Sequence, residues 1–315
     1  MISLGYINFW KDSETDDYLT NFITYHFGEV KVKPPSQNPD ILVCSVFGNV
    51  NAVKKIKSQI KIFYYGENLE RREYNQFKTG ILNSLFDIIA GFHGKSHGEK
   101  FVQFPLWLFY HKFYDVYFTE NIIDHIERTH SVNRKTQKSF ANFCVLIARH
   151  DKNGIRKRMY DIVSEFGSIS CPGKLLNNTK TITNGTREKK NYMKKYIFNI
   201  CPENSATENY VTEKLFEALE SGCVPIYWGH DIPRDIIRRN KILFLKSNFK
   251  KKDFQQYYAS MSSFEGPVFT EKAFEIINKY YIDFVESIQS KLLQTHHKRL
   301  FIDEEAVLHV SWERK

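Results

Sequence analysis

The segment at residues 196–229, YIFNICPENSATENYVTEKLFEALESGCVPIYWG, constrains the fold more than any other part of the chain. It begins as an apolar strand, continues as a polar loop at residues 202–209, and then takes on helical spacing. Thr212 suits the N-cap of that helix, Gly222 suits its end, and VPIYW predicts the following strand. Strand, helix and strand in this order are typical of a βα unit.

Short apolar runs and amphipathic stretches alternate through the rest of the chain as well. In the first half the pattern predicts a helix at 12–26 and strands or short buried elements at 3–9, 41–47, 60–66, 87–92 and 102–109. In the second half it predicts helices at 154–166 and 270–297 and strands at 143–148 and 168–171. The fold class is therefore α/β.

The length of 315 residues exceeds the roughly 100–200 residues of one ordinary domain, so we expect two Rossmann-like domains. Apolar residues nearly vanish at 127–139, which predicts a hinge and places the domains at residues 1–135 and 136–315. Two such domains predict a cleft beyond the carboxyl ends of their strands. No GxGxxG or GxxxxGK[ST] motif occurs, so a bound phosphate must be held in another way.

Composition restricts the compartment and the partners of the chain. The N-terminus lacks the pattern of a signal peptide, and no window approaches the ~20 apolar residues of a membrane span, so we expect a soluble cytoplasmic protein. None of the five cysteines forms a CxxC pair, which predicts reduced structural thiols. The net charge of +9 is scattered, which favours a solvated basic face over a nucleic-acid groove, with attraction to anionic membrane lipid as an intermediate interpretation.

The loop before the helix at residue 213 suits a diphosphate, because backbone N–H groups and the positive end of the helix point above the sheet. Lys214 adds a full positive charge in the first turn, where the helix dipole favours acids. A surface lysine on a capped helix is the alternative interpretation. Two acidic pairs, Glu14/Asp16 and Asp303/Glu305, are interpreted as helix-start and tail acids, so no metal site is predicted.

Several short motifs stand in order along the chain. Glu203-Asn204-Ser205 is followed by YVTEK at 210–214 and PIYWG at 225–229, and YYGEN at 64–68, FPLWLFY at 104–110 and GIRKRMYDIV at 154–163 precede them. Together they resemble the α1,3/4-fucosyltransferase family, the inverting, GDP-fucose-dependent enzymes of glycosyltransferase family 10. The resemblance covers about three quarters of the chain. The chain is similar to compact bacterial or viral members of the family. A viral member would act in the cytoplasm of its host.

The resemblance implies a GT-B fold, with an acceptor-binding domain first and a GDP-sugar-binding domain with a C-terminal helical segment second. The roles it implies are a general base at Glu67, diphosphate neutralisation by Arg156 and Lys214, nucleotide contacts from Asn204 and Tyr210, and a fucose-facing carboxylate at Glu213. Further candidate members of the site are Glu203, Ser205, Thr212, Arg158 and Asn68. Without the resemblance, the sequence favours an ordinary exposed loop glutamate at residue 67, and Arg156 is equally a solvated helix residue.

The mechanism that follows is inversion at the anomeric carbon of fucose. Glu67 deprotonates an acceptor hydroxyl, that oxygen attacks opposite GDP, and the two cations stabilise the leaving diphosphate. No cofactor is required, although Mn²⁺ or Mg²⁺ is a candidate stimulant. The acceptor is an oligosaccharide whose candidate contacts are Asn68, Glu70, Arg71, His93 and His97. The alternatives are a related enzyme that uses another nucleotide sugar, and a non-catalytic glycan- or nucleic-acid-binding protein; the oligomeric state stays open.

Overall fold

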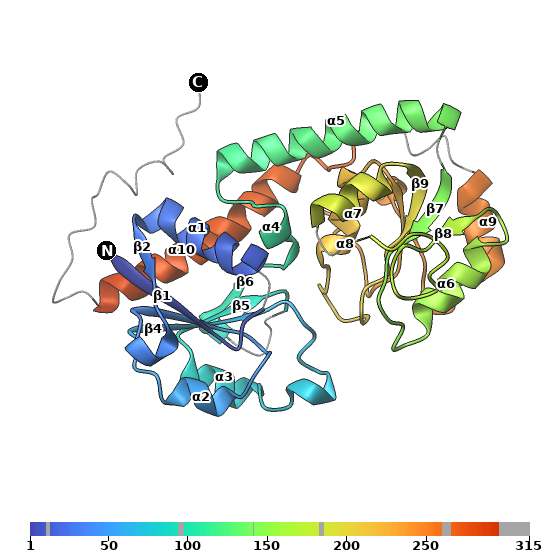
Figure 1. The fold of residues 1–315 in the computed structure, drawn as a ribbon. Coiled ribbons are helices and arrows are strands. Elements are labelled where there is room, and N and C mark those ends of the chain that lie inside the picture. Colours follow the sequence, from blue (N-terminus) through green and yellow to red (C-terminus); the bar gives the residue numbers. More distant parts are fainter. Residues whose placement is uncertain (11–12, 94–97, 141, 183–185, 260–265, 296–315) are drawn as a thin grey trace, which may run out of the picture. The chain divides into compact units, whose positions relative to one another are not determined.

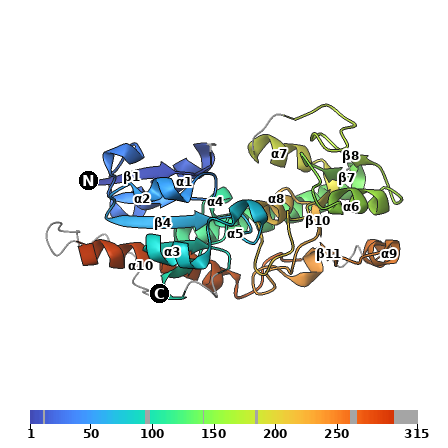
Figure 2. The same cartoon turned by 90° about the horizontal axis from the view of Figure 1, so that it is seen from below.

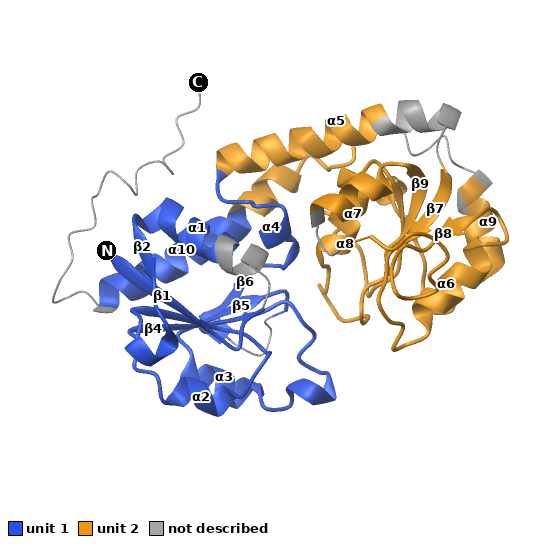
Figure 3. Ribbon diagram, in the orientation of Figure 1, with its two compact units in different colours: residues 1–115, 279–315 blue, residues 116–278 orange. Residues whose placement is uncertain are grey.

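The structure is a computed structural model that describes residues 1–10, 13–93, 98–140, 142–182, 186–259 and 266–295. Among the sequence predictions, His97, Asp303 and Glu305 lie outside these ranges, as do the side chains of Glu14 and Asp16. The chain forms two compact units (Figure 3). Unit 1 contains residues 1–115 together with the segment from residue 279 onward, and unit 2 contains residues 116–278.

The sheet of unit 1 has six parallel strands in the order β2-β1-β3-β4-β5-β6. Every residue of β3 and β5 is buried, which explains why these strands read as unbroken apolar runs. The strands are β1 (Ile2–Ile7), β2 (Val30–Val32), β3 (Ile41–Cys44), β4 (Ile60–Tyr65), β5 (Ile88–Gly91) and β6 (Phe101–Gln103).

Helices cover both faces of this sheet (Figure 1). Helices α1 (Ser13–Phe27) and α4 (Trp107–Tyr110) lie over one face, and α2 (Val50–Lys54) and α3 (Thr79–Leu85) lie over the other. Helix α10 (Ala273–Thr295) enters unit 1 at residue 279. There the ring of Phe284 packs 5.7 Å from that of Phe22 and 4.6 Å from that of Phe104, measured between centroids. The returning helix is therefore part of the core of unit 1.

The sheet of unit 2 has five parallel strands in the order β11-β10-β9-β7-β8. From β7 the chain first adds β8 at one edge of the sheet and then crosses to the other side of β7, where it adds β9. The order of the strands therefore reverses between β7 and β9, which is the topological switch point of the sheet. Ligands of open α/β sheets bind at such a switch point. The strands are β7 (Asn142–Leu146), β8 (Ile169–Ser170), β9 (Tyr196–Ile200), β10 (Val224–Tyr227) and β11 (Leu243–Phe244).

Two groups of helices enclose the sheet of unit 2 (Figure 1; Figure 2). Helix α6 (Ile155–Val163) packs beside α9 (Lys251–Ala259), and its buried Met159 and Val163 join the core, as the helical spacing of the sequence predicts. Helix α8 (Glu213–Glu220) packs against both α5 (Val116–Phe140) and α7 (Thr186–Met193). Among the described helices, none has both the length and the hydropathy of a bilayer-spanning segment.

The α/β class and the two parallel-sheet units predicted from the sequence are confirmed; the cleft stays a prediction. The predicted reduced thiols are also confirmed, since all five cysteines are buried and free.

The stretch at 127–139, predicted as a hinge, lies inside the continuous helix α5, and the predicted division at residue 135 therefore falls within a helix. The compact units instead divide at residues 115 and 278. Polar residues there have structural roles: the Glu127 carboxylate accepts hydrogen bonds from the backbone N–H groups of Val268 and Phe269.

Candidate active site

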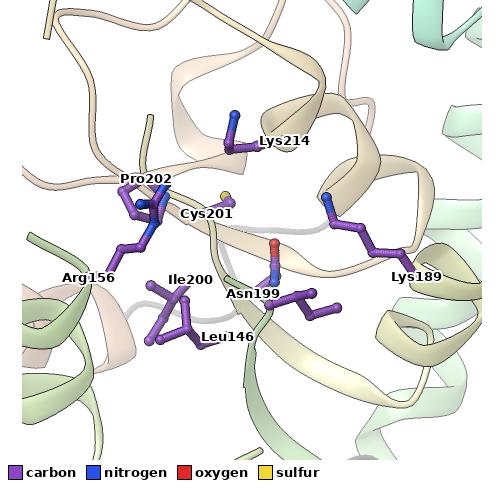
Figure 4. Close-up of a pocket in the computed structure, with 9 residues that line it drawn as sticks. Leu146, Arg156, Lys189, Asn199, Ile200, Cys201, Pro202 and Lys214 are labelled. Carbon is purple, nitrogen blue, oxygen red and sulfur yellow. The ribbon is translucent and has the colours of Figure 1, made fainter. Parts of the chain in front are cut away.

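A pocket lies at the switch point of unit 2 (Figure 4). Its floor is made by the ends of β7 and β9, with Leu146 and Ile147 from the first and residues 199–202 from the second. Its charged lining is Arg156 from α6, Lys214 from α8 and Lys189 from α7. Three cations from three helices therefore meet above the carboxyl ends of two adjacent parallel strands, where such sheets bind ligands.

Arg156 is held in place by the start of helix α6. The Asp151 carboxylate accepts the backbone N–H groups of Arg156 and Lys157 at 3.0 and 2.8 Å, which caps the helix. The guanidinium is buried and donates to the backbone oxygen of His150 at 2.7 Å and to Oδ1 of Asn204 at 2.8 Å. Burial lowers the pKa of this guanidinium, opposed by the Asp151 carboxylate, and an arginine so placed stays charged. Arg156 thus joins the loops that follow β7 and β9.

Glu203 organises the loop between β9 and α8. Its side chain is fully buried. The carboxylate accepts hydrogen bonds from the backbone N–H and the hydroxyl of Thr212 at 2.8 and 2.7 Å, and from the hydroxyl of Tyr227 at 3.2 Å. The Lys214 ammonium lies 3.3 Å away. A buried carboxylate is tolerated only when it is paired and hydrogen-bonded in this way. The position of Glu203 therefore favours holding the loop over contacting a ligand.

Thr212 begins helix α8 as predicted, but its side chain makes no capping hydrogen bond. Its hydroxyl donates to Glu203 and accepts from Lys214 at 2.7 Å. The predicted position of the N-cap at Thr212 is correct, but the predicted capping hydrogen bond is not made. The Thr212 backbone N–H and hydroxyl both donate to the buried carboxylate of Glu203 instead.

Lys214 and Glu213 are both charged at neutral pH. Burial acts to lower the pKa of Lys214, but the Glu203 and Glu213 carboxylates outweigh it and hold that pKa well above its usual value. Burial likewise acts to raise the pKa of Glu213, and the charges of Lys214 and Lys189 reverse the shift, so that this pKa is lowered. The Lys214 ammonium lies 3.5 Å from the Glu213 carboxylate. The structure therefore places a carboxylate directly beside the cationic pocket.

Lys189 is a residue of the pocket that the sequence analysis missed. It lies in the basic segment at 187–195, one of the scattered clusters of positive charge that the sequence analysis interprets as a solvated basic face. In the structure this segment begins as helix α7, where Lys189 pairs with Glu217 of α8 and lines the pocket. The available signal was Met193, one turn later on the same face of α7, which is fully buried. That face therefore points inward.

The remaining donor-site predictions divide into two groups. Asn204 contacts Arg156, Tyr210 is buried at the end of the same loop, and Ser205 is half-buried between them. Arg158 is elsewhere: it donates to the backbone oxygens of Ser247 and Phe249 at 2.8 and 2.6 Å. Its guanidinium also lies 4.6 Å from the ring centroid of Phe249. The structure thus brings Arg156, and not Arg158, to the pocket.

Glu67 lies in unit 1, two residues beyond the end of β4. Its carboxylate accepts a hydrogen bond from Arg71 at 3.0 Å and is 19 % exposed, so it is within reach of solvent. The next residue, Asn68, is buried, and its Oδ1 accepts the backbone N–H of Glu70 at 2.9 Å, which forms an Asx turn. Glu67 is therefore presented by a structured turn at the carboxyl end of the sheet.

Gly66 explains why two of the sequence motifs belong together. A Cβ atom at this position would lie 2.9 Å from the end of the Leu106 side chain, so any other residue would force that side chain to shift. Gly66 belongs to YYGEN and Leu106 to FPLWLFY. His93 follows β5, the neighbour of β4, and its backbone oxygen accepts a hydrogen bond from the Tyr65 hydroxyl. The candidate acceptor contact His93 is thus near the strand end that carries Glu67.

Among the residues that the structure describes, no three His, Cys, Asp or Glu side chains form a group that could hold a metal ion.

Two sequence profiles match the chain, one in each unit. Residues 4–110 match the alpha-(1,3)-fucosyltransferase FucT N-terminal domain, and residues 132–266 match the C-terminal part of glycosyltransferase family 10 (fucosyltransferase). The chain belongs to glycosyltransferase family 10. The second match contains Arg156, Lys189 and Lys214, and so contains the charged lining of the pocket.

Relatives of this family 10 chain come from distant organisms. It is 25% identical over 253 residues to the alpha-(1,3)-fucosyltransferase FucT of Helicobacter pylori, which covers 72% of this chain and 50% of that protein. The chain therefore matches half the length of that relative. It is 47% identical over 51 residues to an alpha-(1,4)-fucosyltransferase of Arabidopsis thaliana, covering 16% of this chain and 13% of the relative.

Solved structures share the fold. A crystal structure of an alpha1,3-fucosyltransferase superposes with a TM-score of 0.64 at 18% identity and covers 96% of this chain and 93% of its own. A crystal structure of an alpha1,3-fucosyltransferase with GDP-fucose gives a TM-score of 0.59 at 19% identity, with 96% and 92% covered. The GT-B type of fold expected from the sequence is therefore shown.

Two arginines of helix α6 provide a matched test of the pocket in this family 10 chain. We expect Arg156→Met to weaken GDP binding by about 10- to 100-fold, since a charge-assisted hydrogen bond contributes about 1.5–3 kcal/mol. Arg158→Met should leave GDP affinity within about threefold, because its guanidinium bonds backbone oxygens outside the pocket. Isothermal titration calorimetry with GDP measures both. Equal losses in the two variants would contradict the assignment of Arg156 to the pocket.

Proposed function

We propose that this chain transfers L-fucose from GDP-fucose to a hydroxyl of an acceptor oligosaccharide with inversion at the anomeric carbon. The observation that carries the proposal is the cluster of Arg156, Lys189 and Lys214 at the switch point of the unit matched by the family 10 profile. Clustered cations beside a helix N-terminus favour an anionic ligand with two phosphates over a neutral sugar.

The names of the relatives support GDP-fucose as the donor. Besides the Helicobacter pylori enzyme, a short segment of 63 residues is 38% identical to GDP-fucose protein O-fucosyltransferase 3 of Xenopus laevis, covering 20% of this chain and 13% of that protein. Both names specify the transfer of fucose, and the Xenopus laevis name specifies GDP-fucose as the donor and a protein as the acceptor. The shared part therefore favours donor binding, and it leaves the identity of the acceptor glycan to experiment.

The proposed reaction needs a proton acceptor and contacts to the leaving group. Glu67 accepts the proton of the acceptor hydroxyl as that oxygen bonds to the anomeric carbon of fucose. The bond from this carbon to the β-phosphate oxygen breaks, and GDP departs with the electron pair, its added charge stabilised by Arg156 and Lys214. Glu213 stabilises positive charge that develops on the sugar ring. Because these side chains supply the charges, the step needs no cofactor, and Mn²⁺ or Mg²⁺ would only stimulate it.

Calorimetry with nucleotide sugars tests the donor. We expect GDP-fucose to bind more tightly than UDP- and CMP-sugars, and mass spectrometry of a glycan panel incubated with GDP-fucose should show products heavier by one deoxyhexose. Binding of a UDP-sugar in preference to GDP-fucose would overturn the donor assignment and favour a related enzyme with another nucleotide sugar. Donor binding without any product across the panel, and without hydrolysis of GDP-fucose, would favour a non-catalytic glycan-binding protein.

A further inference from the structure

We infer that Lys189 is a third donor-binding cation, which contacts the diphosphate together with Arg156 and Lys214. This inference rests on the proposed function, because it concerns the same pocket. It adds a residue from helix α7, an element that none of the sequence motifs of the family resemblance contains.

The position of Lys189 carries the inference. Arg156 and Lys189 reach the pocket from opposite sides, with Asn199 and Ile200 of β9 between them (Figure 4). Lys214 lines the same pocket from the start of α8. A diphosphate that sits over the end of β9 therefore has cations on both sides, and both of its phosphates can be neutralised at once.

The ion pair of Lys189 leaves the ammonium available to a ligand. Glu217 accepts from this ammonium and is almost fully buried, with 2 % of its side chain exposed, whereas 24 % of the Lys189 side chain is exposed. An ammonium group has three N–H donors, so the carboxylate behind it does not exhaust them. Burial acts to lower the pKa of Lys189, but Glu217 and then Glu213 raise it, so the group is a cation at neutral pH.

Lys190 provides a matched control on the same helix. It pairs with Glu220 of α8 at 2.6 Å, and 22 % of its side chain is exposed, nearly as much as for Lys189. The two lysines thus share a helix, a type of partner and a degree of exposure. They differ in that Lys189 lines the pocket and Lys190 is not among its lining residues. Any effect of general positive charge on α7 should be equal for both.

The experiment compares Lys189→Met and Lys190→Met in the full chain by calorimetry with GDP and with GMP. We expect Lys189→Met to weaken GDP binding by about 10- to 100-fold and to weaken GMP binding by a smaller factor. The variant should also show a smaller salt dependence of GDP binding than the wild type. Lys190→Met should leave GDP affinity within about threefold. Equal losses in the two variants, or an unchanged GDP affinity in Lys189→Met, would overturn the inference.

A second variant separates ligand binding from a structural role, because Lys189→Met alone leaves the buried Glu217 without its cation. The double variant Lys189→Met/Glu217→Leu removes the whole pair, and we expect it to regain the melting temperature of the wild type while GDP binding stays weak. Recovery of GDP binding along with stability would show that Lys189 only compensates Glu217, and would overturn the inference.

The wild-type chain distinguishes this test from a failure of the proposed function. If it binds UDP and not GDP, the GDP-fucose assignment fails. The role of Lys189 is then tested with uridine nucleotides, and Lys189→Met should weaken UDP binding more than UMP binding. If it binds GDP and Lys189→Met binds it equally well, the inference about Lys189 fails and the proposed function stands. Absence of binding to any nucleoside diphosphate would overturn both.

Discussion

Glu67→Gln should lower the turnover of GDP-fucose transfer by about 10²–10⁴-fold, the usual contribution of a general base. An amide keeps the shape of the side chain and cannot accept the proton of the acceptor hydroxyl. GDP affinity should not change, because Arg156, Lys189 and Lys214 are untouched. The melting temperature should also change little, since a partly exposed ion pair such as Glu67–Arg71 contributes about 0–1 kcal/mol. Steady-state kinetics with calorimetry of GDP binding measures the separation.

Glu73 provides the control for this variant, because its carboxylate also pairs with Arg71, at 2.6 Å, and is 50 % exposed. Glu73→Gln therefore removes a comparable ion pair of the same arginine without touching the candidate base. We expect its turnover to stay within about threefold of the wild type. A Glu67→Gln variant with wild-type turnover, or one that loses GDP binding to the same extent as turnover, would reject Glu67 as the base.

Glu203→Ala should reduce the free energy of unfolding by about 3–5 kcal/mol, the usual cost of removing one partner of a buried ion pair. The substitution leaves the Lys214 ammonium without its buried carboxylate and removes the acceptor for Thr212 and Tyr227. Because the same carboxylate closes the loop between β9 and α8, GDP binding should weaken as well. Urea denaturation followed by circular dichroism measures the first effect, and calorimetry the second.

Glu213→Ala controls for the loss of a negative charge beside Lys214. Glu213 lies 3.5 Å from the same ammonium but is 17 % exposed, whereas the Glu203 side chain is fully buried. Its removal should therefore cost less unfolding free energy than the removal of Glu203, because Lys214 keeps its pairing with the buried Glu203 carboxylate. If the two variants lose equal stability, the burial and hydrogen bonds of Glu203 do not have the structural role assigned to them.

The sequence predicted most strands of both sheets, because parallel strands that are buried on both faces appear in the sequence as short apolar runs. Lys214 was indicated by its position in the first turn of a helix that follows a strand, and Arg156 was indicated by the family resemblance. Helix α5 was missed because its polar residues resemble a linker in one dimension, and only the structure shows that Glu127 binds the backbone at residues 268 and 269.

Pairings between distant residues account for what sequence analysis could not predict in the site. Lys189 and Glu217 are 28 positions apart, and nothing in the local pattern of either residue indicates its partner. The sequence analysis named Glu203 as a candidate donor contact, whereas its bonds to Thr212 and Tyr227 depend on how the loop folds over β10. Local spacing predicts helices and strands, whereas these contacts depend on how the elements pack together.

The discontinuous composition of unit 1 affects how the protein is made by the ribosome. Phe284, which packs on Phe22 and Phe104, is synthesised only after all of residues 116–278. At translation rates of about 5–20 residues per second, the aromatic surface around Phe22 waits roughly 10–30 seconds for this helix. Unit 2 is continuous and can fold while it emerges. The first unit therefore completes its aromatic core only after the second unit has been synthesised, although its own synthesis begins first.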